Sequence, residues 1–257
     1  MKSREGIFYD ISNEDYHSGP GISSSEIKAA LININRWKRE YVDGEKDDKK
    51  DYFLLGTALH DLLLEPDKFD WHEQPAVVVK NKDMIEGMVQ SIHEHPEAGA
   101  IFSPSGIAEF SCYAKDEPTG LMQKVRPDYY RPDIPHLLFD IKTTTDASKD
   151  GFSRQMGNLK YFVSAAYYLD VARRFLPALE GFVFVVVEKK PPYYVAVYPL
   201  VDDAIKLGRL CYREGLDLIK EAQQKQRFPG YNDDAVVEID VPRYIYTQLG
   251  SKFDSSF

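Results

Sequence analysis

The feature that most limits the fold of this chain is a change in its hydrophobic pattern near residue 107. Before that point, residues 23–34 and 56–66 have the pattern of helices, and Pro66 ends the second one. After it, apolar and polar residues alternate in three successive segments, separated by the turn sequences DEPTG and RPDIP. The three predicted strands are IAEFSCYA (107–114), LMQKVRPDYY (121–130) and HLLFDIKTT (136–144).

A predicted helix over about 158–175 separates these strands from a second strand pair, FVFVVVE and YYVAVY, which flanks KKPP. Another helix is predicted over about 201–226. Strands interrupted by a crossing helix predict a mixed sheet covered by helices, and therefore an α/β fold.

The length of 257 residues suits one large α/β domain, and the sequence contains no internal repeat. We expect a single domain in three parts. These are a mainly helical N-terminal part (1–105), an α/β core that carries the chemistry (106–230) and a C-terminal tail rich in Pro, Gly and Asp (231–257).

Composition excludes several classes of protein. No apolar run approaches the ~18 residues that a membrane helix needs, and the N-terminal residues have no signal-peptide stretch. Two cysteines far apart in the sequence, Cys112 and Cys211, cannot form a disulfide framework or by themselves hold an iron–sulfur cluster. We therefore expect a cytoplasmic protein with no membrane segment and no iron–sulfur cluster.

The net charge of −9 argues weakly against a nucleic-acid partner, because phosphate binding needs lysine and arginine. Residues 149–174, however, hold five basic residues against two acidic ones. This segment is either a solvated helix face or part of a basic groove in an otherwise acidic protein.

Charged residues in two of the predicted strands are candidates for chemistry. Side chains alternate along a strand, so Asp140 and Lys142 share a face and Ile141 points the other way. Four residues of the preceding strand share a face: Met122, Lys124, Arg126 and Asp128. If the strands are neighbours, Asp128, Asp140 and Lys142 converge. An exposed strand with paired charges has the same pattern, but LLFDIKTT is otherwise apolar, and a buried charge needs a partner or a metal.

Two carboxylates and a lysine suit phosphodiester hydrolysis. Carboxylate oxygens bind hard cations such as Mg²⁺, with Mn²⁺ as a possible substitute, and such ions activate a bound water. The lysine can stabilise the charge that develops at the phosphate.

Several segments, taken in order, resemble a known nuclease superfamily. VRPD (125–128) followed by FDIKTT (139–144) resembles the PD-(D/E)xK signature, and GTALHDLLLEP (56–66) resembles the histidine-bearing helix of its RecB-like branch. The segment YDISNEDYHSGPGISSSEIKAAL (9–31) resembles the start of the RecE (exodeoxyribonuclease VIII) nuclease domain of phages and prophages. The resemblance spans most of residues 8–175.

The resemblance implies a restriction-endonuclease-like core with a central mixed sheet flanked by helices. It also implies metal ligands at His60, Asp128, Asp140 and the Ile141 carbonyl, with Lys142 as the catalytic lysine. By pattern alone, a histidine among leucines such as His60 is more often a core residue, and it is the motif context that favours a metal ligand. Five further residues could support the site or contact DNA: Glu109, Lys124, Arg126, Ser164 and Tyr168. For Glu109, an ordinary edge charge is an equal alternative.

One position departs from the family pattern. The helix after the catalytic strand usually carries Q-x-x-x-Y, but here Ser164 stands in the glutamine position, with Tyr168 in the tyrosine position. A serine cannot span the distance of a glutamine amide, and Gln155 lies nine residues too early to replace it.

The serine run Ser23, Ser24 and Ser25 has two interpretations. One is helix capping, which these residue types favour. The other is a pocket for a 5′-phosphate, because hydroxyls and free N–H groups at a helix N-terminus bind phosphate.

By resemblance, the expected function is a Mg²⁺-dependent exodeoxyribonuclease that degrades linear double-stranded DNA 5′ to 3′ and leaves 3′ single strands for recombination. The implied partners are double-stranded DNA ends and a single-strand annealing protein, and a ring-shaped homo-oligomer is implied as well. Two alternatives stay open: a nuclease-fold protein that binds DNA or a partner without cutting, and a RecB-like endonuclease.

Overall fold

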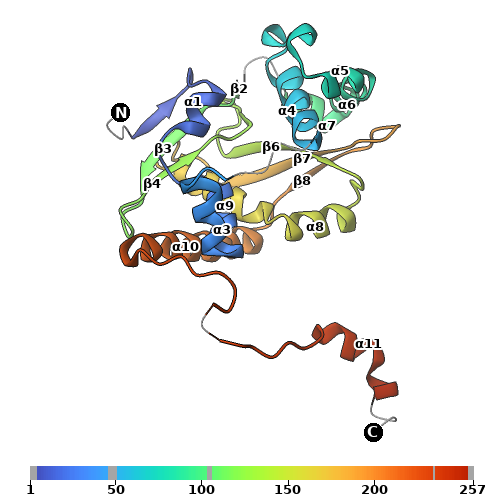
Figure 1. Ribbon diagram of the computed structural model, residues 1–257. Coiled ribbons are helices and arrows are strands. Elements are labelled where there is room, and N and C mark those ends of the chain that lie inside the picture. The colour runs from blue at the N-terminus through green and yellow to red at the C-terminus, as the bar shows by residue number, and fades with distance from the viewer. Residues whose placement is uncertain (1–4, 46–50, 103–105, 234, 254–257) are drawn as a thin grey trace.

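The strands form two sheets in the computed structural model, which describes residues 5–45, 51–102, 106–233 and 235–253 (Figure 1). The larger sheet has the order β2-β5-β6-β7-β8. Its strands are β2 (Ile107–Ala108), β5 (Tyr129–Tyr130), β6 (Leu137–Thr144), β7 (Gly181–Glu188) and β8 (Val195–Pro199). The smaller sheet, with the order β1-β3-β4, contains β1 (Gly6–Phe8), β3 (Ser111–Lys115) and β4 (Met122–Val125).

The larger sheet is mixed, as predicted. Strands β6 and β7 are parallel, and the chain crosses between them through α8 (Lys149–Asn158) and α9 (Tyr161–Arg173). The other pairs in this sheet are antiparallel.

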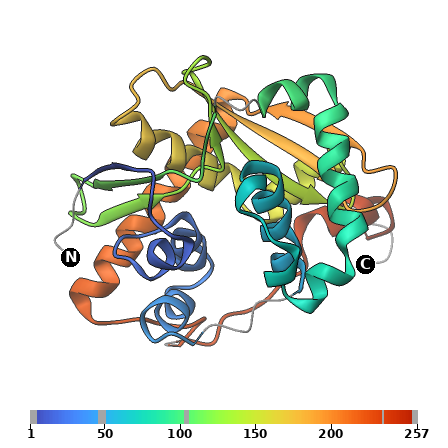
Figure 2. The same cartoon turned by 90° about the horizontal axis from the view of Figure 1, so that it is seen from above.

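Helices cover both faces of the larger sheet, because its central strands are apolar on both sides (Figures 1 and 2). Leu138, Phe182 and Phe184 face a core that also contains α9 and four other helical segments. That side is covered by α2 (Ser24–Ile32), α3 (Ile34–Trp37), α8, α9 and α10 (Asp202–Lys225).

Ile141 and Val185 face the opposite core. That side is covered by α4 (Asp51–Leu64), α5 (Ala76–Lys80), α6 (Lys82–Glu94) and α7 (Pro96–Ile101). Ile141 is fully buried, so truncating it to alanine should cost about 2–5 kcal/mol of stability. The alternation also confirms that Ile141 points away from the face that carries Asp140 and Lys142.

The prediction of three successive strands in one sheet was wrong. Segment 107–114 splits into β2 and β3 around Glu109, which has a left-handed φ of 50°, and segment 121–130 splits into β4 and β5. Pro127 lies in the second break and has no N–H to donate to a strand ladder. Since β4 ends at Val125, Asp128 does not continue the strand face of Met122 and Lys124.

Short elements complete the chain. They are α1 (Asn13–Ser18), a π-helical turn (Lys38–Val42), two 3₁₀ turns (Pro66–Lys68 and Trp71–Glu73) and α11 (Arg243–Phe253). The tail after α10 runs away from the body and carries α11, a helix that the sequence pattern did not predict (Figure 1). Among the helices that the structure describes, none combines the length and the apolar composition needed to cross a membrane.

Candidate active site

Asp128 and Asp140 meet through the pairing of β5 with β6. Tyr129 pairs with Phe139 in this antiparallel ladder, and one step further along the register Asp128 lies opposite Asp140. The Asp128 Oδ2 atom accepts a hydrogen bond of 2.8 Å from the backbone N–H of Ile141. Both carboxylates are buried. Their proximity was expected from the sequence, but the strand that provides it is β5.

His60 reaches the same place from α4. Its Nδ1 atom lies 3.5 Å from Asp128 Oδ2, and its Nε2 atom lies 3.1 Å from the carbonyl oxygen of Ile141. The preceding residue, Leu59, is fully buried and anchors this turn of the helix in the core. His60 itself is half-buried and faces the carboxylates, so it is not a core side chain.

Glu109 joins this group. Ligand atoms of His60, Glu109 and Asp128 all lie within 4.8 Å of one another. The Glu109 N–H donates to the Asp128 carbonyl over 3.1 Å. Arg126 lies 3.9 Å from the Glu109 carboxylate and is itself held by two hydrogen bonds to Ser111 Oγ, of 3.0 and 2.8 Å. Glu109 is therefore closer to a metal-ligand position than the sequence indicated.

Asp140, which is buried, and Lys142, which is half-buried, form an ion pair on the face toward α9. Burial raises the pKa of Asp140 to about 6, and the charge of Asp128 adds to this rise while Lys142 opposes it. Burial alone would lower the pKa of Lys142, but the charges of Asp140 and Asp128 outweigh it and hold that pKa well above its usual range. Burial, followed by the charge of Asp128, raises the pKa of Glu109 to about 8.

These residues fit a divalent cation. The charge of Asp128 raises the pKa values of both Glu109 and Asp140, and the buried Asp140 Oδ2 atom accepts no regular hydrogen bond from the described residues beyond its ion pair with Lys142. Carboxylate oxygens with one imidazole form a donor set that Mg²⁺ or Mn²⁺ can use. His60, Glu109, Asp128 and Asp140, together called the acidic cluster, could hold such an ion.

The Ile141 carbonyl oxygen already has two partners. It lies 3.1 Å from His60 Nε2 and accepts a hydrogen bond of 3.2 Å from Lys142 Nζ. A carbonyl oxygen has two lone pairs, so a metal at this atom would have to replace one of these contacts.

The side chain of Lys124 is committed to the backbone. Its Nζ atom donates to the carbonyl oxygens of Tyr16 (3.0 Å) and Gly19 (2.7 Å), which fixes the segment between α1 and α2. Lys124 is also buried. Lys124 therefore stabilises the backbone next to the site.

Ser164 and Tyr168 lie one turn apart on α9. The Tyr168 hydroxyl shares a hydrogen bond with Ser24, and burial followed by the charge of Asp140 raises its pKa above the usual range. Gln155 bonds to Thr144 Oγ1 at 2.7 Å, so it ties α8 to the end of β6 and does not replace the missing glutamine.

The serine run caps α2. Ser23 is the N-cap residue, and it forms a reciprocal capping box with Glu26 through contacts of 3.3 and 3.2 Å. Ser24 is buried, whereas Ser25 is exposed and shares a hydrogen bond with Tyr41. The capping interpretation is confirmed for Ser23, and the 5′-phosphate remains a prediction.

All three serines line a cleft of about 960 Å³ between the helices α1, α2 and α4, which face one another in Figure 2. Tyr168 also lines this cleft. Burial and then the charge of Asp140 raise the pKa of its hydroxyl, so the acidic cluster lies within electrostatic range of the cleft. At the opposite wall, Tyr52 and Phe53 pack with ring centroids 4.3 Å apart, and both are about half exposed.

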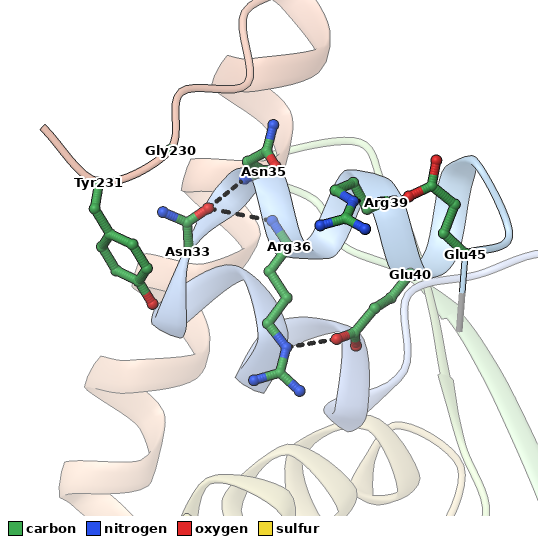
Figure 3. Close-up of a pocket in the computed structure, with 8 residues that line it drawn as sticks. All are labelled: Asn33, Asn35, Arg36, Arg39, Glu40, Glu45, Gly230 and Tyr231. Carbon is green, nitrogen blue, oxygen red and sulfur yellow. Dashed lines mark hydrogen bonds and ion pairs between the residues drawn. The ribbon is translucent and has the colours of Figure 1, made fainter. Parts of the chain in front are cut away.

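A smaller pocket of about 370 Å³ is lined by residues of α3 and the turn after it and by Gly230 and Tyr231 of the tail (Figure 3). Its two arginines are paired with acids: Arg36 with Glu40 at 2.5 Å and Arg39 with Glu45 at 2.7 Å. These pairs offset the positive charge, which makes this pocket a weaker candidate for phosphate than the cleft.

The sequence matches the model of one protein family, a PDDEXK-like domain of unknown function (DUF3799), over residues 23–238. The chain belongs to this family. The matched range of this PDDEXK-like domain includes Lys142 and every residue of the acidic cluster. No curated protein matches the sequence significantly.

A similar solved structure is that of a protein from Eubacterium rectale described as a "Putative exonuclease". It matches with a TM-score of 0.67 and 16% identity, over 93% of this chain and 98% of that one. At this identity the likeness shows the fold, which is restriction-endonuclease-like. The structure of SSO0001 matches with a TM-score of 0.33 and 14% identity, over 71% of this chain and 89% of that one.

Sequence reasoning missed Lys28, which lies on α2 near Lys142 and Asp140. A signal was present: Lys28 follows Ser24 by four residues, so the two share a helix face. Because Ser24 was already a candidate for phosphate binding, that spacing would have pointed to Lys28 as well.

The crowding of carboxylates leads to a prediction for stability. With its pKa raised to about 8, Glu109 keeps its proton in the folded state over a pH range where the unfolded chain, near 4.5, has lost it. Stability in EDTA should therefore fall as the pH rises from 5 to 8. Glu109→Gln removes this effect, so its thermal midpoint should exceed that of the wild type by at least about 2 °C at pH 8 and by much less at pH 5.

The exposed, ion-paired Glu221 provides the control. Glu221→Gln should change the midpoint little at either pH. An equal effect of Glu109→Gln at pH 5 and pH 8 would show that Glu109 is not protonated in the metal-free protein.

Proposed function

We propose that this PDDEXK-like domain is a metal-dependent exodeoxyribonuclease of the RecE-like class. It degrades linear double-stranded DNA from the 5′ end and leaves a 3′ single strand. The observation that carries the proposal is the gathering of His60, Glu109 and Asp128 beside the Asp140–Lys142 ion pair. The description of the Eubacterium rectale protein as an exonuclease supports it through the shared fold.

Each residue has a role in this proposal. A bound Mg²⁺ or Mn²⁺ would supply an activated water and offset charge at the phosphate. His60, Glu109, Asp128 and Asp140 would hold that ion. Lys142 stays protonated because of its acidic neighbours, so its ammonium is available to the phosphate oxygens when the charge on them grows.

The cleft would receive the DNA end. Ser24, at the start of α2, shares a hydrogen bond with Tyr168, and the charge of Asp140 acts on Tyr168, so a 5′-phosphate bound at the serines would leave the first phosphodiester near the acidic cluster. The capping box uses the N–H groups of Ser23 and Glu26, and those of Ser24 and Ser25 would add to this site. The exposed rings of Tyr52 and Phe53 on the opposite wall are suited to stacking on unpaired bases.

The biological setting follows from the same proposal. A 3′ single strand is the substrate of a single-strand annealing protein, which is the partner we propose. A ring of several copies around DNA would reconcile the net charge of −9 with a nucleic-acid substrate, provided that basic residues line the channel and acidic ones face outward.

Ser164 favours one competing function. It stands where the related nucleases carry a glutamine, and a protein without that amide could bind DNA or a partner without cutting. A RecB-like endonuclease is the other alternative, and closed circular DNA separates it from an exonuclease.

A single assay tests the proposal. Linear duplex, labelled at either end and with or without a 5′-phosphate, is compared with closed circular DNA in Mg²⁺, Mn²⁺, Ca²⁺ or EDTA. We expect release of nucleotides from linear DNA in Mg²⁺ and Mn²⁺, little turnover in Ca²⁺ and none in EDTA. Faster loss of the 5′-phosphorylated strand supports the polarity. Undiminished cutting in EDTA, or binding without cutting, contradicts the proposal.

A further inference from the structure

Lys28 and Lys142 approach the same aromatic ring from different elements. The Lys142 Nζ atom lies 5.3 Å from the centroid of the Tyr161 ring, and the Lys28 Nζ atom lies 5.9 Å from it. Lys142 comes from β6, Lys28 from α2 and Tyr161 from the start of α9. Two ammonium groups therefore gather on one side of the acidic cluster, although the two residues are far apart in the sequence.

The two lysines differ in their partners. Lys142 is paired with Asp140, whereas none of the ion pairs or hydrogen bonds identified among the described residues includes Lys28. Lys28 is half-buried, and its neighbours Ile27 and Ala29 are core residues. Burial, together with the Lys142 charge, lowers the pKa of Lys28 to about 8 although the Asp140 charge opposes this, so its ammonium is still mostly charged at pH 7.

Such an arrangement costs free energy in the DNA-free protein. A partly buried cation beside a like charge is destabilising unless an anion offsets it. Neither the capping of α2 nor its packing against α9 and α10 requires a lysine at this position, since the buried faces of α2 are supplied by Ile27, Ala29 and Ala30. An anion that binds at this place would turn the unfavourable pair of charges into a favourable one.

We propose that Lys28 binds the phosphodiester on which the Asp140–Lys142 pair acts, as a second cation beside Lys142. This inference rests on the proposed function and names the residue that completes its phosphate site. A phosphodiester has two non-bridging oxygens, so it can accept hydrogen bonds from two ammonium groups at once. Tyr161 contributes its ring to both ammonium groups through cation–π contacts.

The experiment compares Lys28→Met, which keeps the apolar stem, with Lys28→Arg, which keeps the charge. Lys206→Met is the matched control, because Lys206 is exposed on α10 and paired with Asp203. Three quantities are measured: the single-turnover cleavage rate at saturating linear duplex in Mg²⁺, the duplex affinity in EDTA at several salt concentrations, and the thermal midpoint of the DNA-free protein.

For Lys28→Met we expect a cleavage rate lower by about 10²-fold, the lower end of what one transition-state donor contributes. The slope of log affinity against log salt should become shallower by about 1, as for one lost phosphate contact. The thermal midpoint should equal or exceed that of the wild type, because a repelled cation is gone. Lys28→Arg should recover most of the rate, and Lys206→Met should behave as the wild type.

Two results would overturn the inference while leaving the proposed function intact. One is a wild-type cleavage rate in Lys28→Met. The other is a lowered thermal midpoint of Lys28→Met together with no recovery of the cleavage rate in Lys28→Arg, which would make Lys28 a packing residue. If the wild type itself does not cut, the proposed function fails. In that event an unchanged salt slope in Lys28→Met also overturns the phosphate contact.

Discussion

Replacement of Lys142 by alanine is expected to slow phosphodiester cleavage by about 10²–10³-fold, the loss seen when one transition-state-stabilising donor is removed. The substitution removes the ammonium that lies beside Asp140 but leaves His60, Glu109 and Asp128 in place. Metal binding, followed by calorimetry with Ca²⁺, should therefore persist. Duplex affinity should fall only modestly, because one phosphate contact is a small part of the electrostatic attraction.

The pH dependence of this variant provides a second test. Lys142 opposes the rise in the pKa of Asp140, so that pKa should climb further above about 6 once the ammonium is absent. A group whose pKa rises needs a higher pH to ionise, so the remaining activity should move to higher pH. Added Mg²⁺ should not restore the rate at neutral pH. A variant that cuts DNA at the wild-type rate would contradict the assignment of β6 as the catalytic strand.

Strand alternation made part of this site predictable. In LLFDIKTT, the spacing of Asp140 and Lys142 put both on one face, and the structure confirms it: they form an ion pair, while Ile141 packs on the other side. The histidine helix was also found, and it ends at Leu64, just before Pro66. These features depend on residues near one another in the sequence, where local geometry limits the outcome.

Features that depend on distant residues were predicted only in part. The proximity of Asp128 and Asp140 was expected, but it arises because β5 pairs with β6, and nothing local to residues 121–130 reveals that this segment changes sheets. Glu109 turns toward His60 with a left-handed φ of 50°, a conformation that a glutamate rarely adopts. Such strain is typical of functional sites, where the surroundings hold an unfavourable conformation. The approach of Lys28 from α2 is likewise visible only in three dimensions.

Replacement of Asp128 by asparagine is expected to abolish most metal binding. Asp128 is the residue shared by the whole cluster: it faces His60, accepts a hydrogen bond from the Ile141 N–H, and its charge raises the pKa values of both Asp140 and Glu109. The asparagine carbonyl can still accept the hydrogen bond from Ile141, so the β5–β6 connection should survive. Affinity for Mn²⁺ or Ca²⁺ should fall by at least about 10²-fold, the upper end of the loss caused by removing an outer partner of a ligand.

Stability should change in the opposite direction to metal binding. Without the charge of Asp128, the carboxyl groups of Glu109 and Asp140 are less crowded, so the metal-free variant should unfold at an equal or higher temperature than the wild type at pH 8. Asp203→Asn, at an exposed position on α10, is the control and should alter neither quantity. Unchanged affinity for the metal would mean that the ion binds elsewhere. A large drop in the thermal midpoint of metal-free Asp128→Asn would make Asp128 a structural residue. A metal ligand stabilises the fold only through the ion that it holds, so its loss should not destabilise the metal-free protein.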